Sequence, residues 1–182
     1  MINEFENFSG NKILGFFLFN PRKEVHINGL ARELKIGAGT VKHYCDAFLK
    51  ENILLSHTQG NQRIFSLNNN YFLVKELKKT FGLVLLKDKG LEELVSKGTS
   101  SMAIYGSFAS GEFDNNSDLD LLFLGLIDDI DRVQVSKFSK EIKREVQVVF
   151  YSWAKWEKMK KENHQFAESI LNKHILIKGV NL

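Results

Sequence analysis

Apolar residues recur at helical spacing in three segments of the first part of the chain. The first segment covers residues 11–20 and ends at Pro21, which cannot continue a helix. The second covers 29–35, for which Asn28 is the expected N-cap. The third covers about 40–52 and follows a turn rich in glycine. The pattern therefore predicts three short helices, the first of them largely buried.

Segments of extended character interrupt and follow these helices. They cover 24–27, 53–58 and 63–67, and the last two are joined by a short loop that contains Gly60. A glycine in such a loop favours a β-hairpin. The order of helix, short strand, helix, tight turn, helix and hairpin is that of a winged helix-turn-helix, which we expect over residues 10–69.

The rest of the chain alternates between helical and extended segments. We expect helices at about 70–86 and 91–97, and strands at 101–105, from 118 onward and at 145–150. This alternation predicts a two-domain protein of α/β (α+β) class. The predicted boundaries are a winged helix-turn-helix DNA-binding domain over 1–70, a connecting helix and linker over 71–89, and a second domain over 90–182.

Gly106 and Ser107 follow an apolar strand at the expected start of a short helix. Glycine lets the backbone approach a ligand closely, N–H groups at a helix start attract phosphate, and the serine hydroxyl adds a donor. Ten residues later, Asp118 and Asp120 open the next predicted strand. Residues i and i+2 of a strand share a face, so the two carboxylates would repel each other without a shared cation. Hard oxygen ligands suit Mg²⁺ that carries the phosphates of a substrate.

The segment YGSFASGEFDNNSDLDLLFLG resembles the signature of the DNA polymerase β-like nucleotidyltransferases, and it is most similar to the minimal type found as antitoxins of HEPN toxins. The resemblance covers about residues 90–178. It implies a nucleotidyltransferase fold with a small mixed β-sheet flanked by helices. It also implies transfer of a nucleoside monophosphate, AMP foremost, from an NTP to a protein or small-molecule acceptor.

The same resemblance implies a role for each matched residue. Gly106 and Ser107 would contact the phosphates of the nucleotide, expected to be ATP. Asp118 and Asp120 would be the catalytic residues and would ligate Mg²⁺ or Mn²⁺.

Active members of that family carry a third carboxylate on a neighbouring strand, and the matching strand here is 145–150. Its alternation places Glu145 and Gln147 on one face, with Gln147 at the expected position. Glutamine ligates Mg²⁺ poorly and accepts no proton, and Glu145 would lie about 6–7 Å away along the strand. Three functions stay open: a nucleotidyltransferase enzyme, which the signature favours, a catalytically weak domain that senses nucleotide in a transcriptional regulator, and an antitoxin-like partner of a HEPN protein.

The helix expected at 40–52 resembles the recognition helix of winged helix-turn-helix proteins, because a small residue and a threonine open it. The residues expected to contact DNA bases and phosphates are Thr40, Lys42, His43, Asn61 and Arg63. Asp46 on the same helix face disfavours tight binding. The alternative is a winged helix used only for protein contacts or dimerisation.

Charge and composition add limits to this picture. Residues 1–80 hold 11 Lys and Arg against 7 Asp and Glu, whereas 81–182 hold 14 against 15, so an anionic partner is expected at the first domain. A single cysteine, Cys45, falls on an apolar face and is expected in the core. No signal peptide or membrane segment is expected, and a cytoplasmic location without membrane contact is predicted. A macromolecular partner, such as a HEPN-type protein, or a homodimer is expected to complete the site, because the 182 residues show no obvious separate acceptor-binding domain.

Overall fold

The computed structural model describes residues 7–126, 128 and 130–182. Its elements fall into two compact units, which divide between Phe81 and Gly82 within one long helix, α5 (Phe72–Asp88). The predicted connecting helix is therefore present, although it begins and ends two residues later than the periodicity indicates.

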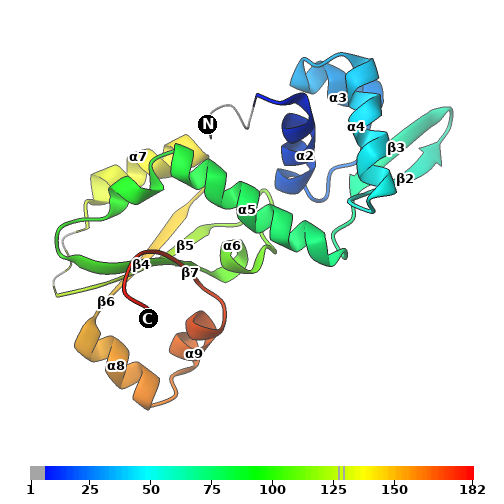
Figure 1. The fold of residues 1–182 in the computed structure, drawn as a ribbon. Helices are drawn as coiled ribbons and strands as arrows, with labels where there is room; N and C mark the ends of the chain where they lie inside the picture. Colours follow the sequence, from blue (N-terminus) through cyan, green and yellow to red (C-terminus); the bar gives the residue numbers. More distant parts are fainter. Residues whose placement is uncertain (1–6, 127, 129) are drawn as a thin grey trace. The chain divides into compact units, whose positions relative to one another are not determined.

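The first unit is a winged helix-turn-helix (Figure 1). Its helices are α2 (Ser9–Phe19), α3 (Ile27–Leu34) and α4 (Ala38–Lys50), and its strands are β1 (Val25–His26), β2 (Leu54–Gln59) and β3 (Gln62–Leu67). The strands form an antiparallel sheet in the order β1-β3-β2. The hairpin of β2 and β3 turns at Gly60, whose φ of 59° lies in the left-handed region that glycine adopts without strain.

One apolar core holds the three helices against this sheet. It is built from fully buried residues such as Phe17 of α2, Val41 of α4 and Phe65 of β3. Cys45 lies in the same core, as predicted, and burial raises the pKa of its thiol to about 12. A thiol so buried and so weakly acidic acts as a small apolar side chain.

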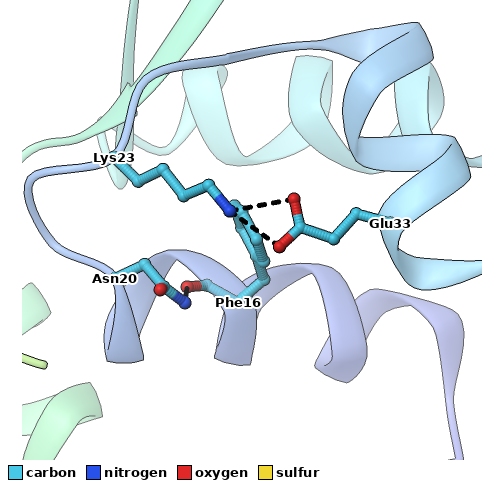
Figure 2. A network of polar contacts seen from close by, with 4 residues as sticks. All are labelled: Phe16, Asn20, Lys23 and Glu33. Atoms are coloured by element: carbon cyan, nitrogen blue, oxygen red, sulfur yellow. Dashed lines mark hydrogen bonds and ion pairs between the residues drawn. The ribbon is translucent and has the colours of Figure 1, made fainter.

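The segment between α2 and α3 is held by polar contacts (Figure 2). Lys23 donates from Nζ to both carboxylate oxygens of Glu33, at 2.7 and 2.9 Å, and its ammonium lies 4.7 Å from the centre of the Phe16 ring. Asn20 Nδ2 donates to the carbonyl of Phe16 at 2.7 Å, and the backbone N–H of Asn20 donates to the same carbonyl at 3.0 Å, so both groups cap the end of α2. These contacts fix where the chain leaves one helix for the next.

The N-cap of α3 differs from the prediction. Asn28 lies inside the helix, and His26 caps it, because His26 Nδ1 accepts the N–H of Gly29 at 3.0 Å. An imidazole nitrogen serves the same purpose as the carboxamide oxygen that we expected there.

The second unit is built on a mixed four-stranded sheet in the order β6-β5-β4-β7. Its strands are β4 (Thr99–Tyr105), β5 (Leu119–Gly125), β6 (Val146–Ser152) and β7 (Ile175–Gly179). Strand β5 runs parallel to β6 and antiparallel to β4, which pairs with β7 on its other side. The predicted α/β (α+β) class with a small mixed sheet is confirmed.

Helices cover both faces of this sheet (Figure 1). They are the last turns of α5, the 3₁₀ turn η1 (Leu91–Leu94), α6 (Gly106–Ser110), α7 (Arg132–Ile142), α8 (Trp153–Lys161) and α9 (Gln165–Asn172). Helices α8 and α9 pack on the face that carries Leu122 and Leu124, with the fully buried Trp156 between them and the sheet. The helix predicted at 91–97 is present only as the single turn η1.

Two aspartates of the acidic segment before α7 make defined side-chain contacts. Asp131 caps α7, since its Oδ1 accepts the N–H groups of Val133 and Gln134 at 2.9 and 3.1 Å. Asp128 forms an ion pair with Arg132 at 2.7 Å, and Asp129 lies outside the described residues. No helix within the described part of the chain is long and apolar enough to cross a membrane.

Candidate functional site

The end of β4 brings Gly106 against an acidic side chain. Gly106 is the first residue of α6 and has a φ of 66°, in the left-handed region. A Cβ atom at this position would overlap Oδ2 of Asp120 and would lie 3.1 Å from its carboxyl carbon. Glycine is therefore needed here both for the backbone angle and for the space that Asp120 occupies.

The two predicted metal ligands differ in their backbone setting. Asp120 is the second residue of β5, whereas Asp118 precedes the strand, which begins one residue later than predicted. Both side chains are partly buried. Burial and the nearby Asp118 carboxylate raise the pKa of Asp120. A bound cation would reverse this effect, because it favours the ionised form of both carboxylates.

Three neighbouring strands place a row of residues beside the acidic pair. Asp120 is the register partner of Tyr105 on β4 and of Gln147 on β6. Register partners of adjacent strands present their side chains on the same face. The register of β6 places Gln147 directly beside Asp120, at the position where a third acid was expected.

Gln147 is exposed, and its side chain forms a hydrogen bond with the side chain of Glu145. Its Nε2 donates to Glu145 Oε1 at 2.7 Å, while the carbonyl of Glu145 accepts the N–H of Leu119 at 2.9 Å. Among residues 7–126, 128 and 130–182, no three His, Cys, Asp or Glu side chains are grouped to hold a metal ion. Glu145 therefore does not join the acidic pair in this structure.

The approach to Asp118 is a closed turn. Ser117 Oγ accepts the N–H of Asp114 at 2.8 Å and donates to Asp114 Oδ1 at 3.2 Å. Asp114 Oδ1 also accepts the N–H of Asn116 at 3.0 Å. The hydroxyl of Ser117 thus closes the turn that leads to Asp118.

Tyr105 is a site residue that the sequence did not reveal. It immediately precedes Gly106, and burial, Asp120 and Tyr151 together raise the pKa of its hydroxyl to about 12. Its ring packs edge-to-face on Phe166, with 5.6 Å between the ring centres. Tyr105 thus keeps a neutral hydroxyl at physiological pH. Its position just before the Gly-Ser pair was the only signal for it in the sequence.

The residues expected to contact DNA lie on the first unit. Thr40, Lys42 and His43 are exposed on α4, and Asn61 is exposed in the hairpin turn. Arg63 is also exposed, but its Nη1 lies 2.9 Å from Asp46 Oδ1, in an ion pair. Its Nε donates to Ser56 Oγ at 3.2 Å. Strand β3 and helix α4 are thereby joined by the residue expected to touch phosphate.

A family comparison decides what the second unit is. The family described as nucleotidyltransferase domain matches residues 87–177, half of the chain. The chain belongs to this family. Its nucleotidyltransferase domain thus contains the Gly106–Ser107 pair, both aspartates and Gln147 within the matched residues. No curated protein matches the chain at a significant level.

Solved structures resemble parts of the chain. MepR, a transcription regulator of a Staphylococcus aureus multidrug efflux pump, is 14% identical at a TM-score of 0.40, over 52% of this chain and 73% of MepR. Sso10a-2, a DNA-binding protein from Sulfolobus solfataricus, is 19% identical at a TM-score of 0.34, over 50% of this chain and 99% of the Sso10a-2 chain. A toxin–antitoxin structure with AMP-PNP is 16% identical at a TM-score of 0.35, over 57% of this chain and 74% of the chain in that structure. At such TM-scores these likenesses say nothing about the ligands or partners of this chain.

Replacing Gly106 with alanine tests the close approach within the nucleotidyltransferase domain. The left-handed backbone conformation costs a residue with a Cβ about 1–2 kcal/mol, so we expect the free energy of unfolding to fall by that amount. Displacement of Asp120 should also weaken binding of an NTP with Mg²⁺ by about tenfold, that is by about 1.4 kcal/mol. Denaturant unfolding and isothermal titration measure the two effects.

The matched control is Gly39→Ala in α4, where an added Cβ would meet nothing within 4 Å. This variant should bind nucleotide as the wild type does. Unchanged nucleotide binding in Gly106→Ala would show that the space beside Asp120 does not matter for the site.

Proposed function

We propose that the nucleotidyltransferase domain binds a nucleoside triphosphate, ATP foremost, together with Mg²⁺ or Mn²⁺, and transfers the nucleoside monophosphate to a hydroxyl of a protein or small molecule. The observation that carries this proposal is the contact between Gly106 and Asp120. It brings the expected phosphate-binding turn against the expected metal ligand, which is the arrangement that a metal-bound triphosphate requires.

Each residue would have a distinct role in the proposed reaction. Backbone and hydroxyl groups of Gly106 and Ser107 would hold the β- and γ-phosphates, and the carboxylates of Asp118 and Asp120 would hold the metal. A bound divalent metal supplies charge neutralisation of the phosphates. The acceptor oxygen attacks the α-phosphorus, the bond from that phosphorus to the bridging oxygen breaks, pyrophosphate leaves, and the acceptor proton passes to solvent.

Gln147 sets the expected level of activity. An amide cannot take the acceptor proton at the position beside Asp120, since it has no basic form at neutral pH. We therefore expect slow turnover with intact nucleotide and metal binding. The domain boundaries of this proposal are a DNA-binding domain over 1–70, a connecting segment over 71–89 and the nucleotidyltransferase domain over 90–182.

Transfer of label from an α-labelled NTP tests the enzyme directly. The protein is incubated with each NTP and Mg²⁺, with and without a lysate as the source of acceptor, and pyrophosphate release is followed in parallel. Label in an acceptor together with pyrophosphate, both lost in Asp118→Ala, is the expected result. Tight nucleotide binding without label or pyrophosphate would rule out the transferase and favour the second function.

The second candidate function is a transcriptional regulator whose nucleotidyltransferase domain senses nucleotide. The exposed Thr40, Lys42 and His43 on α4 favour this function, together with a glutamine in place of the third acid. This candidate predicts binding of duplex DNA that changes with NTP and Mg²⁺. Three further predictions stay open. They are an antitoxin-like role with a HEPN-type protein, association into a homodimer, and a cytoplasmic location.

Exchange of one lysine tests the proposed DNA surface. Lys42→Ala should weaken binding to all duplex sequences and should reduce the slope of log K against log salt by about 1, as expected for one lost phosphate contact. Asp46→Asn should have the opposite effect, because it releases Arg63 from its ion pair. Fluorescence anisotropy with labelled duplexes over a range of salt concentrations measures both variants.

Lys12→Ala in α2 is the control for this experiment, since it removes the same charge from another exposed helix position of the same unit. It should leave the salt slope unchanged. Equal effects of Lys12→Ala and Lys42→Ala would contradict a defined DNA surface on α4.

A further inference from the structure

Arg144 lies in the short link between α7 and β6, and its own backbone is held in place. Its N–H donates to the carbonyl of Ser139 at 3.2 Å, and Ser139 Oγ donates to the carbonyl of Arg144 at 2.6 Å. Lys143 just before it has a φ of 54° and ends α7 in the left-handed region. The side chain of Arg144 thus starts from a fixed point of the nucleotidyltransferase domain.

The guanidinium of Arg144 binds the turn that leads to Asp118. Its Nη1 donates to two backbone carbonyls, that of Asp114 at 2.5 Å and that of Ser117 at 2.9 Å. These are the first and last residues of the turn closed by the Ser117 hydroxyl. Ser117 is the neighbour of Asp118, so the Arg144 guanidinium holds the backbone from which the Asp118 carboxylate projects.

The same guanidinium also contacts a ring of the helix that begins with the Gly-Ser pair. It lies 5.3 Å from the ring centre of Phe108 and 5.8 Å from that of Phe113, and the two rings stack at 4.2 Å with 7° between their planes. Phe108 comes directly after Ser107 and is almost fully buried. Arg144 therefore touches both halves of the site, the α6 segment and the turn before Asp118.

We propose that Arg144 is a positioning residue that fixes the Asp118 carboxylate relative to Gly106 and Ser107. The inference rests on the proposed nucleotide and metal site and deepens it. Arg144 contacts backbone and rings rather than reacting atoms, so it acts through Asp118. In metal sites, groups that orient the ligands typically affect metal affinity by about 10–100-fold.

Arginine suits this position better than lysine for a geometric reason. A planar guanidinium can donate in its plane to two carbonyls while its face lies over aromatic rings. An ammonium is a compact point charge that does not stack in this way. Arg144→Lys should therefore retain only part of the effect, and Arg144→Met should lose it.

Amide hydrogen exchange of the ligand-free protein tests the positioning itself. In Arg144→Met, we expect the amides of Asp114, Asn116 and Ser117 to exchange about 10–100-fold faster, because the turn loses hydrogen bonds to a charged group. Arg144→Lys should lie between this variant and the wild type. The amides of β4 within the sheet should keep their protection, which shows that the domain is still folded.

Isothermal titration with ATP, with and without Mg²⁺, tests the consequence. Arg144→Met should weaken binding of ATP with Mg²⁺ by about 10–100-fold and should alter binding of ATP alone much less. A merely structural role would weaken both equally. The control is Arg132→Met. It removes an exposed arginine of α7 that pairs with Asp128, and it should change neither the amide exchange of the turn nor the binding of ATP.

The outcomes separate this inference from the proposed function. Unchanged exchange of the turn in Arg144→Met overturns the positioning role, whatever the nucleotide does. Equal weakening with and without Mg²⁺ also overturns it. If the wild type binds no nucleotide but the turn of Arg144→Met exchanges faster, the proposed function fails while Arg144 is still shown to fix the turn before Asp118.

Discussion

Replacing Asp120 with asparagine should abolish the stabilisation of the protein by NTP with Mg²⁺ and should raise the melting temperature of the ligand-free protein. The first effect follows because an amide is a poor ligand for Mg²⁺. A ligand at 100 times its Kd stabilises by about 2.7 kcal/mol, and this shift should disappear in the variant. The second effect follows because Asp120 carries an unfavourable charge beside Asp118 when no cation is bound.

The pH dependence of the ligand-free protein follows from the same pKa. Burial and Asp118 raise the pKa of Asp120 from its ordinary value of 3.8, so the folded state holds this proton more tightly than the unfolded state. The resulting stabilisation is complete below pH 3.8 and is lost as pH rises through the raised pKa. The advantage of Asp120→Asn over the wild type should therefore grow as pH rises through this window.

Thermal unfolding of both proteins between pH 4 and pH 8, with and without NTP and Mg²⁺, measures both effects. Asp128→Asn is the matched control, because it removes a carboxylate from an exposed ion pair outside the site. It should retain the stabilisation by NTP with Mg²⁺. Retention of that stabilisation in Asp120→Asn would contradict the metal role of this carboxylate.

Replacing Gln147 with glutamate should increase turnover. Gln147 is the register partner of Asp120, and glutamate has nearly its shape, so the new carboxylate would stand beside the acidic pair. A positioned base contributes about 10²–10⁴-fold to rate, and we expect a gain towards the lower end of this range. Pyrophosphate release at saturating NTP and Mg²⁺ measures the gain.

The same variant should be less stable without ligand. Glutamate at this position loses the hydrogen bond from Gln147 Nε2 to Glu145 and adds a like charge next to both Glu145 and Asp120. Gln134→Glu on α7 makes the same substitution away from the acidic pair and should not raise turnover. Unchanged turnover in Gln147→Glu, with nucleotide binding intact, would show that a missing third acid does not limit the reaction.

The parts of the site that follow strand geometry could be predicted from sequence. The alternation of residues in strands places Asp120 and Gln147 on one face, and the parallel register of β5 and β6 makes them neighbours. The family signature led us to expect Gly106 and Asp120 in one site, and the structure places the two residues against each other. Alternation gives the face of each residue within its own strand, whereas the pairing of the two strands was expected only from the family resemblance.

Contacts between side chains distant in sequence could not be predicted in this way. Arg144 reaches back 30 positions to the carbonyl of Asp114, and nothing in its neighbourhood in the sequence marks that partner. The pair of Arg63 with Asp46 joins a strand to a helix across 17 positions. Such contacts depend on how elements pack, which a periodicity does not encode.

A crystal structure of the protein with Mn²⁺ and a non-hydrolysable ATP analogue tests the central claim most directly. Anomalous scattering locates the manganese independently of the protein model. We expect it within coordination distance of carboxylate oxygens of both Asp118 and Asp120, with the β- and γ-phosphates against the backbone of Gly106 and Ser107. Manganese or triphosphate bound elsewhere, with these four residues free of both, would contradict the account.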